Sequence, residues 1–274
     1  MSTSVFMEDL DAFTYRERLA TGGRLVIVPV GSVEQHGPHL PLTTDVLLAR
    51  AVSGRLAEAL GALVAAPIVY GYKSQQRSGG GNHLGGTTSL DATTMIAIAR
   101  SLTLEFARHG AERVVFLNGH FENYQFLYEG VELATTELSL RTGGGPGVEA
   151  MLVSYWDFVD DATLDEVYAG SFPGWEVEHG GVLETSLMLH LCPQLVDLGR
   201  VMDLPPAELP RYDVLPVRSE LTPASGCLSS AARASKEAGR LLLERTTAAL
   251  TEAIGRAFPE PSRCNDVALS EINP

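Results

Sequence analysis

The sequence predicts an α/β fold, a mostly parallel β-sheet with helices on both faces that together make a three-layer sandwich. Short apolar runs alternate with longer amphipathic segments, which is the order of parallel strands joined by crossover helices. With 274 residues, of which 45% are hydrophobic, the chain can bury one large core. No repeat or low-complexity linker marks a boundary, so we expect a single domain over residues 1–274 with a C-terminal tail over about residues 260–274.

Apolar runs and capping residues set the expected elements of the first half. Leu25–Val30 is uniformly apolar, as expected for a strand buried on both faces. Threonines before the second helix and Gly61 after it are typical helix start and stop signals. In chain order we expect a helix over residues 7–20 closed by Gly22 and Gly23, a strand over 24–30, a helix from Thr43 or Thr44 to about Leu60, and a strand over 62–71.

A long irregular segment over residues 72–91 interrupts this alternation. It contains five glycines between Gly79 and Gly86, which permit a close approach of the backbone or a mobile lid. No G-K-[ST] sequence follows the glycines, so the segment is not a phosphate-binding loop. Connections of about 20 residues without regular structure are uncommon in compact domains and are often functional.

The second half repeats the alternation and ends in a long helix. We expect a Pro-rich surface segment from Leu204 to Ser225. His109, at a predicted helix end, is most simply a cation near the negative end of the helix dipole. The expected elements are helices over 91–109, about 122–140, about 182–191 and 229–258, and strands over 113–117 and 149–155.

Charge and cysteine content exclude several classes of protein. The net charge of −14 and the absence of a basic run argue against nucleic-acid binding and suit a small neutral or cationic substrate. No apolar run approaches the roughly 20 residues that span a bilayer. The N-terminus lacks the pattern of a signal peptide, and Cys192, Cys227 and Cys264 form neither a disulfide framework nor a metal motif. We therefore expect a cytoplasmic protein with no membrane partner.

Two pairs of metal-binding side chains follow two predicted strands. Glu34 and His36 come after the first, and His120 and Glu122 come after the third. Side chains at i and i+2 of an extended segment point the same way, and parallel strands bring their carboxyl ends to one edge. Asp45, in the first turn of a predicted helix, could simply favour the helix dipole, but beside these pairs we interpret it as a ligand. Oxygen and nitrogen ligands without cysteine predict a divalent-metal site.

Five candidate ligands could hold one crowded ion, or two ions bridged by Asp45. With two ions, each receives three protein contacts and keeps positions open for water or substrate, which is typical of catalytic rather than structural sites. Two ions about 3.5–4 Å apart generate hydroxide at neutral pH and polarise a carbonyl group. We favour this dinuclear arrangement over a single crowded ion. Its open coordination also argues against a non-catalytic metal-binding or scaffold protein, in which closed coordination is expected.

The motifs GSVEQHGPHLPL, with Asp45, and NGHFEN resemble the creatininase family. The stretches GYKSQQRSGGGNH, GTTSLD, LSSA, SYWDFV, GWEVEHGG and ETSLML extend the resemblance over roughly residues 4–258 and make it closest to the creatinine-hydrolysing members. The resemblance implies two divalent ions per subunit, of zinc or manganese type, and a homohexamer. It also implies reversible hydrolysis of the cyclic amide of creatinine to creatine.

The same resemblance implies the distribution of the metal ligands. Glu34, Asp45 and His120 would hold one ion, and His36, Asp45 and Glu122 would hold the other. A hydroxide that bridges the ions would attack the ring carbonyl of the substrate while one ion stabilises the developing oxyanion. Glu122 would therefore belong to both the ligand set and the catalytic set.

The remaining roles are also carried over from the family motifs. His179, oriented by a carboxylate neighbour such as Glu178, would donate a proton to the departing ring nitrogen. Trp156 and Trp175 would enclose the flat substrate by stacking. Ser78 lies in the glycine-rich loop of the substrate-binding set, and Phe121 stands where the best-known members have tyrosine. The alternative is a related amidohydrolase that acts on a formamide or a small modified peptide.

Overall fold

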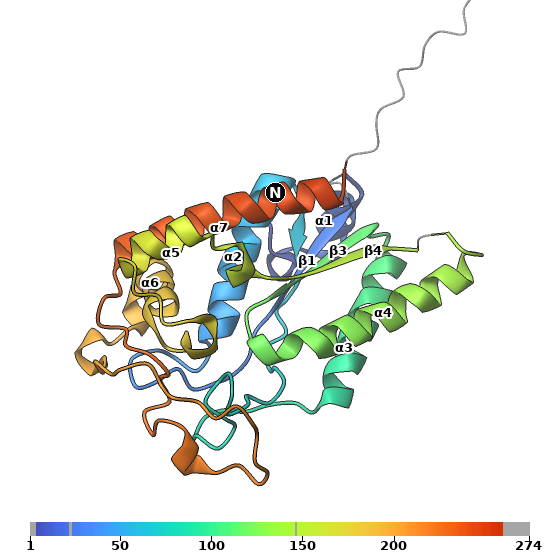
Figure 1. The fold of residues 1–274 in the computed structure, drawn as a ribbon. Helices are drawn as coiled ribbons and strands as arrows, with labels where there is room; N and C mark the ends of the chain where they lie inside the picture. Colours follow the sequence, from blue (N-terminus) through green and yellow to red (C-terminus); the bar gives the residue numbers. More distant parts are fainter. Residues whose placement is uncertain (1–3, 22–23, 146, 260–274) are drawn as a thin grey trace, which may run out of the picture.

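The computed structural model describes residues 4–21, 24–145 and 147–259, and within them four parallel strands form one sheet (Figure 1). The strand order is β2-β1-β3-β4. The in-register pairs run from Leu25 with Arg113 to Val30 with Asn118 between the two central strands. The strands are β1 Leu25–Val30, β2 Leu63–Val64, β3 Arg113–Asn118 and β4 Glu149–Ser154.

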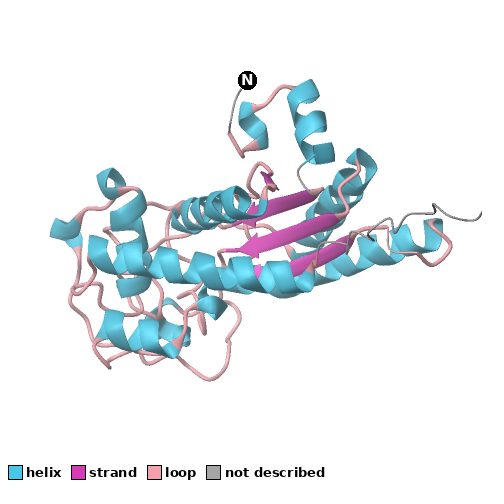
Figure 2. Cartoon of the chain, turned by 90° about the horizontal axis from the view of Figure 1, so that it is seen from above, coloured by secondary structure: helices cyan, strands magenta, loops and turns pink. Residues whose placement is uncertain are grey.

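Helices cover both faces of this sheet, so the predicted three-layer α/β fold is confirmed (Figures 1 and 2). Strand β1 is buried along its whole length, and its side chains alternate between two hydrophobic cores. Leu25 and Ile27 pack with α2, α6 and α7, whereas Val26, Val28 and Val30 pack with α3 and α4. The α-helices are α1 Ala12–Thr21, α2 Thr44–Leu60, α3 Ala92–His109, α4 Tyr124–Arg141, α5 Asp161–Tyr168, α6 Val182–Leu191 and α7 Lys236–Ala257.

Local capping signals explain where the predicted helices begin and end. Helix α2 ends before Gly61, which adopts the left-handed conformation (φ 68°), and α3 ends the same way at Gly110 (φ 96°). The side chain of Asp91 accepts a hydrogen bond from the Thr94 amide at 2.9 Å and caps the start of α3. These helices lie within one residue of their predicted bounds.

Four elements differ from the prediction. The strand expected over residues 62–71 is reduced to Leu63–Val64, because Pro67 has no amide to donate to the ladder. The helix expected over residues 7–20 is interrupted, because the Asp11 carboxylate accepts amide hydrogen bonds from Phe13 and Thr14 and starts α1 at Ala12.

The other two differences concern the second half. The helix expected from Ser229 begins only at Lys236, where the Ser235 hydroxyl accepts the Ala238 amide. Helix α5 was not predicted, although Asp160 caps it by accepting the Thr163 amide at 2.8 Å. The predicted stop at Gly22 and Gly23, the predicted tail and Cys264 lie outside the described residues. Across the described chain, no helix is both long and apolar enough to cross a lipid bilayer.

The loops at the carboxyl ends of the strands are packed tightly against α2. A Cβ atom placed on Gly31 would lie 2.5 Å from the backbone nitrogen of Val46, and one placed on Gly119 would lie 2.7 Å from the carbonyl oxygen of Asp45. The segments that follow β1 and β3 therefore both approach the first turn of α2. This convergence positions the candidate ligands.

Candidate metal centre

The five predicted ligands meet in the interior beside the carboxyl ends of β1 and β3. Glu34, His36, Asp45 and His120 are each 3% exposed or less, and Glu122 is 8% exposed. Such burial of three carboxylates is costly unless cations or hydrogen-bond donors face them. The convergence of these side chains, predicted from the strand order, is therefore observed.

Asp45 lies between the two histidines. Its Oδ1 atom is 2.9 Å from Nε2 of His36, and its Oδ2 atom is 3.2 Å from Nδ1 of His120. The same His120 nitrogen lies 3.0 Å from Oε2 of Glu34. Suitable donor atoms of Glu34, Asp45 and His120 all lie within 4.8 Å of one another. These three residues are the first ligand set implied by the sequence motifs, and Asp45 contacts both histidines.

Three ligand atoms in this cluster make no hydrogen bond of normal geometry, although two of them have the close ionic contacts given above. They are Oε1 of Glu34, Nε2 of His36 and Oδ2 of Asp45, and all three are inaccessible to solvent. Buried polar atoms are nearly always hydrogen-bonded or coordinated. Unsatisfied nitrogen and oxygen atoms on converging side chains therefore fit divalent metal ions of the zinc or manganese type.

The electrostatics of the cluster point the same way. Burial alone would lower the pKa of His36, but the charges of Asp45 and Glu184 outweigh it and hold that pKa well above its usual value. Burial would also lower the pKa of His120, but the charges of Glu34 and Glu122 outweigh this effect and hold that pKa well above its usual value. Burial would raise the pKa of Asp45, yet the facing imidazoles lower it. The site therefore stabilises positive charge, as protons or as metal ions.

Glu184, which the sequence did not predict as a site residue, also lies beside His36. Its Oε1 atom lies 3.5 Å from Nε2 of His36, and donor atoms of His36, Asp45 and Glu184 lie within 4.8 Å of one another. Its Oε2 atom accepts the Gly180 amide at 2.7 Å. The available signal was an acidic residue in the first turn of the mainly apolar helix α6.

Glu122 lies on the other side of His120. Its Oε2 atom is 3.3 Å from Nε2 of His120, while its Oε1 atom accepts hydrogen bonds from the Gln75 amide and the Ser78 hydroxyl. Glu122 therefore lies beside His120, and Glu184 lies beside His36. Ser78 accordingly holds a candidate ligand in position.

The glycine-rich segment approaches the centre closely, as its composition predicted. A Cβ atom on Gly79 would lie 2.7 Å from Oε1 of Glu34 and 3.3 Å from Oε1 of Glu122. Glycine at this position therefore lets the backbone of residues 72–91 cover the cluster.

His179 lies beside the cluster and is 6% exposed. Its Nε2 atom is 2.8 Å from the carbonyl oxygen of Gln35 and 3.9 Å from Oε1 of Glu34. Glu178 points elsewhere, because its Oε1 atom accepts the Leu183 amide at 2.8 Å at the start of α6. The carboxylate that faces His179 is thus Glu34, whereas the sequence suggested Glu178.

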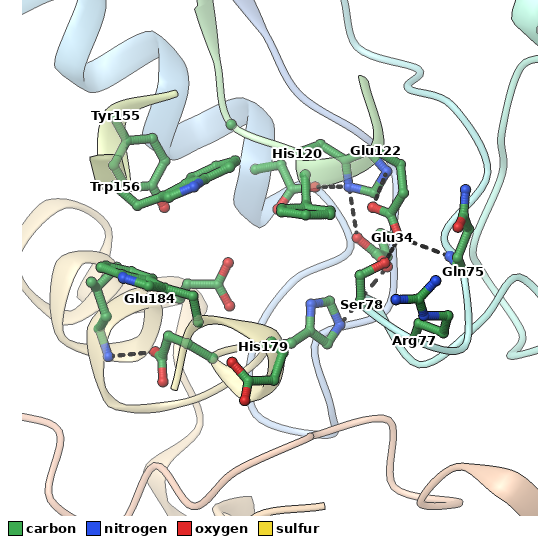
Figure 3. A pocket seen from close by; sticks show the side chains of 18 residues that line it. Glu34, Gln75, Arg77, Ser78, His120, Glu122, Tyr155, Trp156, His179 and Glu184 are labelled. Atoms are coloured by element: carbon green, nitrogen blue, oxygen red, sulfur yellow. Dashed lines mark hydrogen bonds and ion pairs between the residues drawn. The ribbon is translucent and has the colours of Figure 1, made fainter. Parts of the chain in front are cut away.

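A cavity of about 460 Å³ opens over the ligands (Figure 3). Trp156 and Glu184 lie on one side of it, and Gln75, Arg77 and Ser78 lie on the opposite side. Trp175 and Phe121 also line it and remain 39% and 64% exposed. All four residues predicted to bind substrate therefore lie at this cavity.

Comparison with known proteins gives consistent matches. A family model described as creatininase, creatinine amidohydrolase, matches residues 8–254. Creatinine amidohydrolase of Pseudomonas putida is 51% identical over 260 residues, which cover 94% of this chain and 99% of that one.

Solved creatininase structures agree over the same extent. A manganese form and a Zn-Zn form of a glutamate-to-glutamine variant each align with a TM-score of 0.90 at 50% identity, over 94% of this chain and 100% of theirs. A glutamate-to-glutamine variant in complex with creatine aligns with a TM-score of 0.89 at the same identity and coverage.

Proposed function

The chain belongs to the creatininase family, and on that premise we propose that it is a metal-dependent hydrolase that opens the cyclic amide of creatinine to give creatine, reversibly. One observation carries the proposal. Unsatisfied buried donor atoms on Glu34, His36 and Asp45 lie at an aromatic-lined cavity in a chain half identical to a creatinine amidohydrolase.

Two divalent ions, zinc or manganese, would be held by this cluster. Glu34, Asp45 and His120 would bind one ion, and His36 and Asp45 would bind the other. Glu184 is the nearest further carboxylate to His36, so we add it to the second set beside the motif-derived Glu122. When bound, the ions supply a nucleophilic water at neutral pH and polarise the substrate carbonyl.

The protein's own residues position the substrate and move the proton. The contact between Nε2 of His179 and the Gln35 carbonyl favours the tautomer with its proton on that nitrogen and the lone pair on Nδ1. That lone pair can take a proton from the attacking water and pass it to the ring nitrogen of the substrate, which needs one as the C–N bond breaks. Glu178 assists indirectly, because it anchors the segment before α6 through the Leu183 amide.

The cavity walls suit a small flat molecule. The indoles of Trp156 and Trp175 and the ring of Phe121 offer faces for stacking on a planar amidine-like ring. Phe121 has no hydroxyl, so hydrogen bonding to substrate falls to other groups. The exposed fraction of Trp175 indicates that this wall stands at the mouth of the cavity.

We also propose a homohexamer in the cytoplasm, as the family resemblance implies. The free thiols of Cys192 and Cys227 are consistent with a reducing compartment. Light scattering coupled to size-exclusion chromatography tests the assembly, because a hexamer would have about six times the mass of the 29.4 kDa chain.

The decisive experiment follows creatinine loss and creatine formation by purified protein, before and after chelation and after addition of Mn²⁺ or Zn²⁺. We expect creatine formation that chelation abolishes and metal restores. A metal-loaded protein that leaves creatinine unchanged would reject the proposal. In that case a formamide or a small modified peptide becomes the next substrate to test.

A further inference from the structure

A second hollow of about 370 Å³ opens beside the main cavity. The two hollows share the side chains of Phe121, Glu122 and Trp156 as part of their walls. The second one extends away from the ligand cluster toward the start of α4 and the turn after β4. The side hollow is therefore an immediate neighbour of the main cavity.

The lining of the side hollow is aromatic and acidic. Phe121, Tyr124, Phe126 and Trp156 contribute four rings, and Glu122 and Asp157 contribute two carboxylates. The other residues that line it in the described chain are neutral, with no lysine, arginine or histidine. The main cavity differs, because its lining combines six carboxylates with the basic side chains of Arg77, His120 and His179. Aromatic faces combined with a carboxylate are a recognition chemistry for organic cations.

Asp157 lacks a partner of its own. Throughout the described residues, no hydrogen bond or ion pair reaches its carboxylate, whereas the neighbouring Glu122 accepts from the Gln75 amide and the Ser78 hydroxyl. The residue is exposed, and partial removal from water raises the pKa of its carboxyl. The ring of Phe126 packs against Tyr72 with 4.1 Å between centroids, which holds this part of the wall in place.

We propose that this side hollow binds the guanidinium group of creatine, with Asp157 as its charge partner and the surrounding rings as its walls. The inference rests on the proposed function. Creatinine is largely neutral near pH 7, whereas creatine carries a guanidinium cation, so the ring opening creates the charge that this lining favours. The side hollow thereby distinguishes the open-chain form from the cyclic form.

The substitution Asp157→Asn tests the proposal, because it keeps the shape of the side chain and removes the charge. The binding of methylguanidinium chloride and of creatine to metal-loaded protein is measured by calorimetry. We expect both dissociation constants to rise about five- to tenfold, the range for loss of a partly solvated cation contact. Methylurea, a neutral molecule of similar shape, should bind the unsubstituted protein more weakly than methylguanidinium by a similar factor.

Asp165→Asn is the matched control, because Asp165 is exposed on α5 and lines neither hollow. Equal dissociation constants for Asp157→Asn and the unsubstituted protein would overturn the proposal, and so would a failure of the unsubstituted protein to bind methylguanidinium. In the creatine-to-creatinine direction, KM should rise with little change in kcat/KM, because Asp157 stabilises the bound open-chain form. KM for creatinine should stay unchanged.

The two proposals fail in different ways. If creatinine is not hydrolysed but methylguanidinium binding depends on Asp157, the proposed activity is wrong and the cation site stands. If creatine forms but Asp157→Asn binds methylguanidinium as tightly as before, the activity stands and the cation site is wrong.

Discussion

The Oε1 atom of Glu184 lies 3.5 Å from Nε2 of His36. The other oxygen of the same carboxylate accepts the Gly180 amide at 2.7 Å, one residue beyond His179. A single side chain on α6 therefore contacts both the second ligand set and the turn that carries the proposed proton-transfer residue.

Glu184→Gln should weaken the second metal site. The amide can still accept the Gly180 hydrogen bond, but it loses the negative charge beside His36. We expect roughly 10- to 100-fold lower affinity for the second ion. Elemental analysis after dialysis should show a metal content that falls from two ions per chain toward one. Glu129→Gln, an exposed substitution on α4, is the control, and two retained ions in Glu184→Gln would contradict the role.

Metal binding should release protons. The pKa values of His36 and His120 are held well above 6.5 by the surrounding carboxylates, so both imidazoles are protonated at pH 7 in metal-free protein. A metal ion needs the neutral ring as its ligand. Titration of Zn²⁺ into metal-free protein in weak buffer at pH 7 should therefore release about two protons per chain. Binding without proton release would show that these imidazoles are already neutral.

The same shifts predict how the stability of the metal-free protein depends on pH. A histidine whose pKa is raised by folding stabilises the folded state fully below its unfolded pKa, about 6.5, and loses that contribution as the pH rises through its folded value. The melting temperature of metal-free protein should fall as the pH rises above 6.5. With saturating metal, this fall should be much smaller, and thermal unfolding with and without chelator compares the two directly.

Glu178 should make the folded state less stable at high pH. Removal from water, followed by the charge of Glu184, raises its pKa to about 7. An acid with a raised folded pKa favours folding while it is protonated, so its contribution declines as the pH rises from about 4.5 through 7. Glu178→Gln keeps an acceptor for the Leu183 amide and removes this titration.

We therefore expect Glu178→Gln to raise the melting temperature at pH 8 by about 2–4 °C, the shift that 1 kcal/mol produces in a chain of this size. At pH 5 the variant and the unsubstituted protein should melt together. Turnover should largely survive, because Glu178 does not contact His179 through a hydrogen bond. A complete loss of turnover with normal stability would instead assign Glu178 a direct catalytic role.

His179→Ala should lose turnover and keep its metal. The ring lies beside Glu34 but is proposed to transfer protons rather than to bind an ion. A loss of about 100-fold or more in kcat with two ions retained is the expected result. Full activity would reject the assignment. Loss of an ion would instead place His179 in the ligand set, because donor atoms of Glu34, His36 and His179 also lie within 4.8 Å of one another.

The parts of the molecule that follow local rules were predictable from sequence. Strand β1 is a uniform apolar run, and helices α2 and α3 are bounded by capping residues. The order of the strands along the chain then predicted that Glu34, Asp45 and His120 would meet. Glu184 could not be found this way, because its contact with His36 depends on how α6 packs against a distant loop. The second strand was predicted too long for a similar reason. An apolar run that contains Pro67 has the composition of a strand, but the structure pairs only Leu63–Val64 as one.

The metal ligands and the two tryptophans of the cavity wall come from different stretches of the chain, whereas Phe121 lies among the ligands. Residues 34–122 supply the five motif ligands, whereas Trp156 and Trp175 belong to residues 155–179. An engineer could therefore retailor substrate preference by exchanging the wall segment while leaving the ion-holding scaffold intact. The exchanged segment would have to end before Glu184, because this residue contacts His36 of the ligand cluster.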